Sequence, residues 1–115
     1  MAIATIDVVF QRVQVAVPGT SVALATQPYD NTHTIIFYNR GANAVLISLG
    51  AAGGPIAVGG GADLPVGAAL TWALGAVSYR PGPLFSSAPI IIDSVGGAGD
   101  VSVQMFQAIP QVGPT

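Results

Sequence analysis

The chain has 115 residues, of which 7% are charged: three arginines, five aspartates, no lysine and no glutamate, for a net charge of −2. This length predicts a single domain over residues 1–115. Three scattered arginines do not make the basic patch of a nucleic-acid-binding protein, so we expect no nucleic-acid partner. Because the chain contains no cysteine, a disulfide framework and thiol chemistry are both excluded.

The shortage of charge also predicts how the surface is used. Charged residues usually make up about 25% of a globular chain, and about a third of the surface of a domain of this size stays exposed after folding. The mean hydropathy is +0.66, so the expected surface is neutral and made of small residues. Such a surface suits burial against other copies or a larger assembly. The alternative is a monomer covered by serine, threonine, glutamine and asparagine.

A membrane partner is not expected, although residues 41–62 are uncharged and long enough to span a bilayer. This stretch contains seven glycines and Pro55, which are unfavourable inside a helix by about 1 and about 3 kcal/mol each. The N-terminus carries Asp7 and has no positively charged region, unlike a signal peptide. Residues 41–62 therefore read as strands and turns.

The first third of the chain predicts a long strand, a short strand and a polar loop. The long strand covers residues 3–17 and contains two alternating sets: Ile6, Val8 and Phe10, then Val13, Val15 and Val17. The parity changes between the two sets, which predicts a bulge or bend near Gln11 and Arg12. Residues 21–26 form a short strand with Val22 and Leu24 inward, and residues 27–33 form the loop.

Two apolar runs in the middle of the chain predict a central hairpin. Residues 34–39 and 45–49 are apolar at nearly every position, which indicates burial on both faces of a sheet. Residues 40–43 between them contain glycine and asparagine, which accept the backbone angles of a tight reversal. We therefore expect the two runs to pair with each other and Gly41 to adopt a positive φ.

The second half of the chain predicts further short strands. Residues 50–61 are a turn, a short strand and another turn, and a turn at residues 63–67 leads into a strand at 68–73 in which Trp72 is the best core candidate. Residues 90–92 form a buried central strand. Residues 100–106 alternate, with Val101, Val103 and Met105 on one face.

This pattern predicts an all-β fold. No segment has a helical period, and glycine- and proline-rich turns recur every 8–12 residues. The expected architecture is an antiparallel β-sandwich or a jelly-roll-like barrel of about eight short strands. Extended arms are expected at residues 1–12 and 108–115.

No set of residues predicts catalysis or a cofactor. His33 is the only histidine, and the aspartates lack the spacing of a metal loop. Asp63 and Asp93 could meet as a pair of catalytic carboxylates, but nothing in their spacing favours this over turn caps. We therefore expect no metal, no cofactor and no enzymatic activity. Four aromatic residues could form a sugar-stacking platform, but their spacing favours core and hairpin pairs for most of them: Tyr29, Tyr38, Trp72 and Tyr79.

Partner contacts are expected at the arm-like ends and in a proline-bounded loop near residue 84. Large apolar side chains in such segments are either anchored in the core or offered to a partner. The residues expected to contact a partner are Phe10, Arg12, Arg80, Leu84, Phe85 and Val112.

One pattern of turn and strand residues resembles a known group of proteins. It consists of Asn39, Gly41, Asn43, Val45, Ile47 and Gly50, followed by the turn at 64–67, the strand at Trp72 and the alternating strand at 101–106. Over residues 34–106 the chain resembles the small β-rich structural proteins of tailed bacteriophages, which decorate or cement capsids or occur in heads and tails.

The resemblance implies a virion protein on the capsid surface, made in the host cytoplasm. It also implies a homotrimer that binds the major capsid protein across several subunits. One alternative is a phage tail or baseplate component. Another, from a different class, is a carbohydrate-binding or adhesion module.

Overall fold

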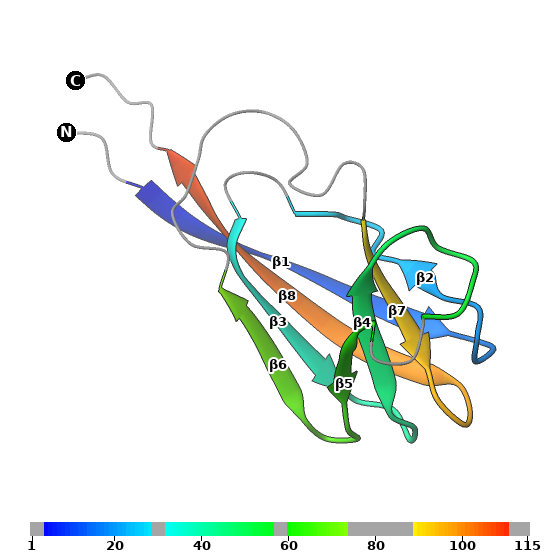
Figure 1. Cartoon of the computed structure of the whole chain (residues 1–115). Helices are drawn as coiled ribbons and strands as arrows, with labels where there is room; N and C mark the ends of the chain where they lie inside the picture. Colours follow the sequence, from blue (N-terminus) through cyan, green and yellow to red (C-terminus); the bar gives the residue numbers. More distant parts are fainter. Residues whose placement is uncertain (1–3, 29–31, 57–59, 74–88, 111–115) are drawn as a thin grey trace, which may run out of the picture.

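The computed structural model describes residues 4–28, 32–56, 60–73 and 89–110. Within these ranges the regular structure consists of strands, and no helix suited to crossing a membrane is found. The fold is all-β, as the sequence predicts (Figure 1). The strands are β1 (Ala4–Val15), β2 (Val22–Ala23), β3 (Thr32–Asn39), β4 (Val45–Leu49), β5 (Ala62–Leu64), β6 (Ala69–Ala73), β7 (Ile90–Ser94) and β8 (Gly99–Pro110).

The strands form two four-stranded antiparallel sheets. The larger sheet has the order β1-β8-β3-β6, and the smaller has the order β2-β7-β4-β5. The first strand pairs with the last, the second with the seventh, the third with the sixth and the fourth with the fifth. This nested pairing folds the whole chain as one long, rolled hairpin, the arrangement of an eight-stranded jelly roll.

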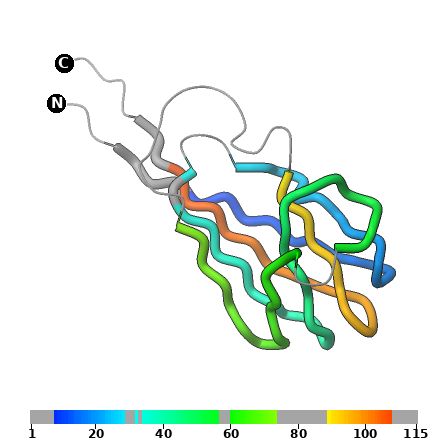
Figure 2. The backbone as a smooth tube through the Cα atoms, in the orientation of Figure 1, coloured from blue at the N-terminus to red at the C-terminus, as the bar shows by residue number. Residues whose placement is uncertain are grey.

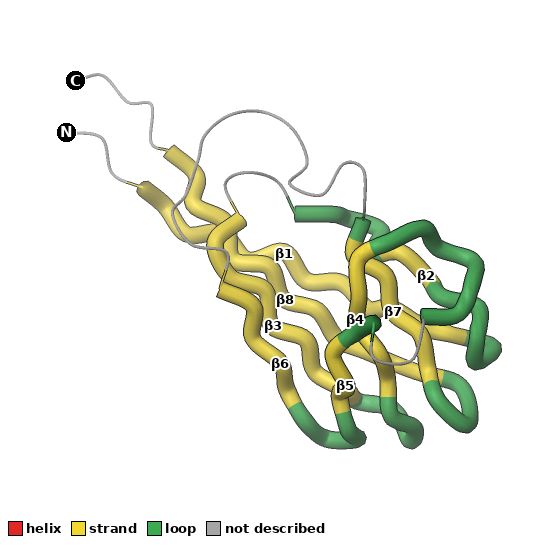
Figure 3. The backbone as a smooth tube through the Cα atoms, in the orientation of Figure 1, coloured by secondary structure: helices red, strands yellow, loops and turns green. Residues whose placement is uncertain are grey.

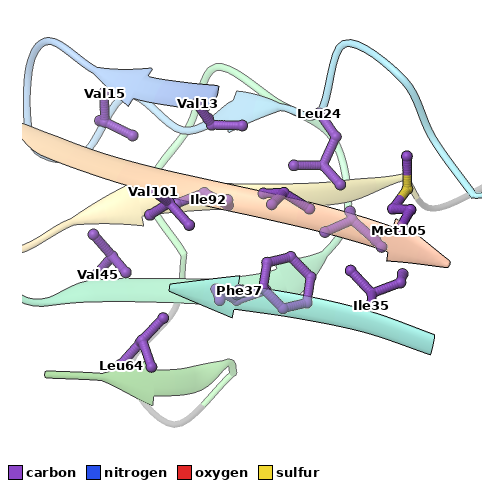
Figure 4. Packing of buried hydrophobic residues seen from close by; sticks show 13 residues of the cluster. Val13, Val15, Leu24, Ile35, Phe37, Val45, Leu64, Ile92, Val101 and Met105 are labelled. Atoms are coloured by element: carbon purple, nitrogen blue, oxygen red, sulfur yellow. The ribbon is translucent and has the colours of Figure 1, made fainter. Parts of the chain in front are cut away.

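The core lies between the two sheets and is built from one face of each (Figure 4). On β8 the predicted alternation is confirmed, because Val101, Val103 and Met105 are at most 1% exposed. The prediction for β7 is also confirmed, since this strand lies between β2 and β4 and all five of its residues are buried. The core residues are Val13, Val15, Leu24, Ile35, Phe37, Val45, Ile47, Leu64, Ile90, Ile92, Val101, Val103 and Met105.

The predicted central hairpin is wrong. β3 pairs with β8 and β6, whereas β4 pairs with β5 and β7, so the residues between them cross from one sheet to the other. The expected burial of β3 on both faces is also wrong, because its outer face is half-buried or exposed and carries Tyr38, which is 45% exposed. A short linker suits a crossing between packed sheets as well as a hairpin, and the apolar runs alone do not distinguish the two.

Asn39 explains how the chain makes this crossing. Its side chain is fully buried and donates hydrogen bonds to the carbonyl oxygens of Asn43 (2.9 Å) and Leu64 (3.0 Å). Its Oδ1 accepts a hydrogen bond from the backbone of Gly41 at 3.0 Å. The amide therefore ties the crossing segment to the smaller sheet. Gly41 is not among the residues with positive φ, so that expectation is wrong.

β1 pairs with β8 without the expected bulge. Its register with β8 continues without a shift from Ala4 to Val15. The two strands lie side by side in Figure 2. The parity does not change at Gln11 and Arg12, because Val9, Val13 and Val15 all face the core. The even-numbered residues from Val8 to Gln14 face outward. The expected arms are partly strand as well, since residues 4–12 pair with residues 102–110, and the remainder of both arms lies outside the described residues.

Candidate interaction surface

The larger sheet turns one face to the core and the other outward. Because directly opposed residues of antiparallel strands share a face, the register places the outer side chains in rows across the four strands. The central row runs from Phe10 through Gln104 and Ile36 to Thr71. The rows on either side of it are Val8, Phe106, Thr34 and Ala73, and Arg12, Ser102, Tyr38 and Ala69.

This outer face carries apolar side chains without a covering layer of charge. Phe10 is 71% exposed and Tyr38 is 45% exposed, and Val8, Ile36 and Phe106 are half-buried on the same face. Between them lie neutral glutamine, serine, threonine and alanine side chains. We define the outer face by these five apolar residues. Exposed apolar area of this kind on a sheet is typical of a surface that contacts another protein.

The charges of the outer face are gathered at one end, around Asp100. Arg12 donates two hydrogen bonds to this carboxylate, from Nε to Oδ1 at 2.8 Å and from Nη2 to Oδ2 at 2.6 Å. Arg40 approaches more loosely, with Nε 3.7 Å from Oδ2 and one Nη1 bond of 3.4 Å to Ser102. The hydrogen bond from Arg12 is the main cause that holds the pKa of Asp100 below its ordinary value of 3.8. Two of the three arginines therefore share one aspartate.

A shallow hollow of about 400 Å³ lies beside this cluster. It is bordered by the ring of Phe10 and by Arg12, Arg40, Ser102 and Gln104. The hollow combines an exposed aromatic ring with guanidinium groups, a combination common at protein contact sites. It lies on the outer face, so any partner that covers Phe10 also reaches the arginines.

The smaller sheet has a different outer side, because loops cover part of it. Gly53 donates to the carbonyl of Ser21 at 2.9 Å, which holds the loop after β4 against the segment before β2 (Figure 3). Asp93, only 3% exposed, accepts hydrogen bonds from the backbone of Gly19 (2.9 Å), Ile56 (3.4 Å) and Ser94 (2.8 Å). Asp93 thus fastens two loops over this sheet.

The position of Asp93 does not favour a catalytic pair with Asp63. Asp93 and Asp63 both lie opposite Leu46, on its two neighbouring strands, so they are two strands or about 10 Å apart. The carboxylate oxygens of Asp93 are taken up by backbone amides, as in a turn cap. Among the described residues, no group of three or more histidine, aspartate or glutamate side chains could hold a metal ion.

Tyr38 and Trp72, the two of the four aromatic residues that the structure describes, do not form a sugar-stacking platform together. Tyr38 lies opposite Ala69 on the outer face, whereas Trp72 lies opposite Ile35 on the core face. Trp72 is half-buried and packs edge-on against Phe37, with ring centroids 5.0 Å apart. Tyr29 and Tyr79 lie outside the described residues. The core side of Trp72 is confirmed, but its burial is only partial.

The residues expected to contact a partner divide into two groups. Phe10 and Arg12 lie together on the outer face and border the hollow. The others lie outside the described residues: Arg80, Leu84, Phe85 and Val112.

Sequence reasoning missed several members of the surface. The sequence alone predicts a doubly buried strand at Ile36 and Tyr38 and a turn at Arg40. Their signal was present in the parity of β3, where Ile35, Phe37 and Asn39 alternate with them. Pairing with β8, which cannot be read from local sequence, was needed to bring them beside Phe10.

No family model matches this chain, and no curated protein matches it.

Proposed function

We propose that this protein is a structural component of a tailed-bacteriophage virion that decorates or cements the capsid. The observation that carries the proposal is the outer face of the larger sheet, where Phe10 and Tyr38 stand exposed among neutral side chains. Contact with a capsid surface would remove this apolar area from water, worth about 25 cal/mol per Å² before the costs of association.

Two further observations support the proposal. The jelly-roll order of strands occurs widely in viral capsid proteins, although it also occurs in lectins and so supports the function only by analogy. The second observation is the low charge of the whole chain. A protein that is bound to a large assembly does not need a strongly charged surface to stay in solution. In this role the protein acts mechanically, by bridging capsid subunits.

The test is co-sedimentation with empty shells assembled from the major capsid protein of a tailed bacteriophage. We expect the protein to sediment with shells but not with isolated capsid subunits, because several weak contacts engage together only on a shell. Binding should persist at about 0.5 M salt, where the Debye length is only a few Å. Loss of binding at that salt concentration would contradict an apolar contact.

A matched pair of variants assigns the contact to the outer face. Tyr38→Glu places a charge on that face, whereas Val66→Glu places one on the turn between β5 and β6, where Val66 is 54% exposed. We expect the first variant to lose shell binding and the second to retain it. Equal binding by both variants would show that the outer face is not the capsid contact. A glycan array run alongside tests the carbohydrate-binding alternative.

A further inference from the structure

β1 is an edge strand with a long open side. Its twelve residues pair with β8 on one side, and no described residue pairs with it on the other. An open edge offers a row of backbone donors and acceptors to any added strand. Gln11 contacts Thr26 with two hydrogen bonds, of 2.8 and 3.2 Å, but both are made by the side chain of Gln11, so they use no backbone group of β1.

This edge lacks the usual protection. Natural edge strands are shortened, bulged, or interrupted by proline or lysine, which discourage pairing with another chain. β1 is twelve residues long, has no proline, lysine or glycine, and keeps an unbroken register. Its charges are Asp7 and Arg12, and the charge of Arg12 is neutralised within the chain by Asp100. The strand is thus suited to accepting a neighbour.

The hydrogen bonds at Asn39 show which residues of β1 face the open edge. Asn39 donates to Ala68 (3.0 Å) and accepts from Gly67 (3.0 Å), so its backbone points away from β8. Val101, opposite Asn39, then directs its backbone toward β1, where it meets Val13. Since the direction alternates along a strand, the even-numbered residues of β1 have backbone groups aimed at the open edge.

We propose that this edge pairs with β1 of a second copy, antiparallel about a twofold axis at Val9. In this register residues 4–14 of the two copies pair along their whole length. Val8 lies opposite Phe10 of the second copy, and Val9 lies opposite Val9 of the second copy. Even positions pair with even positions, so every backbone group aimed at the edge finds a partner. Next to the axis, apolar residues oppose apolar residues: Val8 lies opposite Phe10 on the outer face, and Val9 lies opposite Val9 on the core face.

A second copy explains features that an unrelated peptide would not. In such a pair β1 forms the contact in both copies, so the lack of edge protection in this one strand accounts for both partners. The two outer faces join into one, and Phe10, the most exposed of the large apolar side chains in the described part of the chain, is covered in part by Val8 of the second copy. The result is a continuous eight-stranded sheet. This contact goes beyond the proposed function and makes pairs, whereas the phage resemblance implies three copies.

The first test is the mass of the full chain in solution, by light scattering across a concentration series. We expect twice the 11.5 kDa of one chain, unchanged at about 0.5 M salt because the contact is made of backbone hydrogen bonds and apolar side chains. A mass of one chain at all concentrations overturns the proposal, and so does a mass of three chains.

Two lysine variants separate edge pairing from contact between outer faces. Phe10 and Ile36 lie in the same row of the outer face, but only Phe10 belongs to β1. We expect Phe10→Lys to have the mass of one chain and Ile36→Lys to remain a pair. Dissociation of both would show that the faces pack against each other, which overturns the edge contact. Far-ultraviolet circular dichroism verifies that each variant is folded.

A proline variant tests the backbone directly. The amide of Val8 faces the open edge, so Val8→Pro removes no bond to β8 but blocks the added strand. The amide of Val9 faces β8, so Val9→Pro should destabilise the single chain. We expect Val8→Pro to have the mass of one chain. Its melting temperature should be close to that of the wild type at concentrations low enough to dissociate the pair. In the wild type the amides of Val8 and Phe10 should exchange slowly with deuterium, and fast exchange in a paired sample would overturn the proposal.

Discussion

Arg12 holds the carboxylate of Asp100 with two hydrogen bonds, of 2.8 and 2.6 Å, although 88 residues separate the two in the sequence. The register makes this possible, because Gln14 lies opposite Asp100 and Arg12 is its next neighbour on the same face. The pair therefore links the first strand to the last, independently of the backbone ladder. It also places a titratable contact at the end of the outer face.

Asp100→Asn should make the stability of the protein less dependent on pH. The pKa of Asp100 is lowered, chiefly by its hydrogen bond with Arg12, so the carboxylate stabilises the fold above pH 3.8. That contribution is lost as the pH falls through the lower pKa of the folded state. We expect the wild type to exceed the variant in free energy of unfolding at pH 7, with the difference shrinking below about pH 4. Denaturant titrations at several pH values measure it, and Asp63→Asn serves as control. A constant difference would contradict the assignment.

Asn39→Leu should destabilise the fold strongly. The buried amide serves the carbonyl groups of Asn43 and Leu64 and the N–H of Gly41. An unsatisfied buried group costs about 1–3 kcal/mol, so we expect the free energy of unfolding to fall by at least about 2 kcal/mol. The control is Asn43→Ala, which removes one exposed side-chain bond to Ala98 and should cost about 0.5–1 kcal/mol. Chemical denaturation of both variants decides, and equal losses would refute a special role for Asn39.

Ser94→Ala should stabilise the protein. The Oγ of Ser94 is buried and has no hydrogen-bond partner among the described residues, so removing the hydroxyl relieves about 1 kcal/mol of desolvation cost. Ser21 is similarly buried but donates to the carbonyl of Gly54 at 2.6 Å, so Ser21→Ala should lose about 1 kcal/mol. Thermal melts of the two variants should therefore shift in opposite directions. Destabilisation by Ser94→Ala would mean that its hydroxyl has a partner.

Gly41→Val should cost more stability than Ala42→Val. A Cβ on Gly41 would lie 3.1 Å from the backbone nitrogen of Asp100 and 3.2 Å from its Cβ, whereas Ala42 is exposed. Forcing a branched side chain into such a space costs about 1–3 kcal/mol. Melting temperatures of the two variants compare the effects, and equal shifts would mean that β8 lies further from this segment.

The sequence predicted the fold class well because alternation is a local property. The set Val101, Val103 and Met105 and the run Ile90–Ile92 show their burial directly. The pairing partners were not predictable in the same way. Residues 34–39 and 45–49 are joined by a linker short enough for a hairpin, and only the buried amide of Asn39 shows that they belong to different sheets.

The candidate surface was predicted in part, for the same reason. Phe10 and Arg12 were identified, but the parity of β1 did not reveal which set faces the core. The pairing with β8 is needed to show that the set with Val13 and Val15 faces the core. The neighbours of Arg12, namely Asp100 and Arg40, come from distant parts of the chain and have no shared local signal.

The nested pairing sets the order in which this protein can fold during synthesis. β8 lies between β1 and β3, and β7 lies between β2 and β4, so the middle of each sheet is made from the last part of the chain. Until residues 90–110 leave the ribosome, β1 and β2 lack the strands they pair with. Long-range pairing of this kind folds slowly and leaves unpaired strands exposed to other chains. We therefore expect nascent chains that stop before residue 90 to be recognised by chaperones, and chains in which residues 90–110 have emerged to escape this recognition.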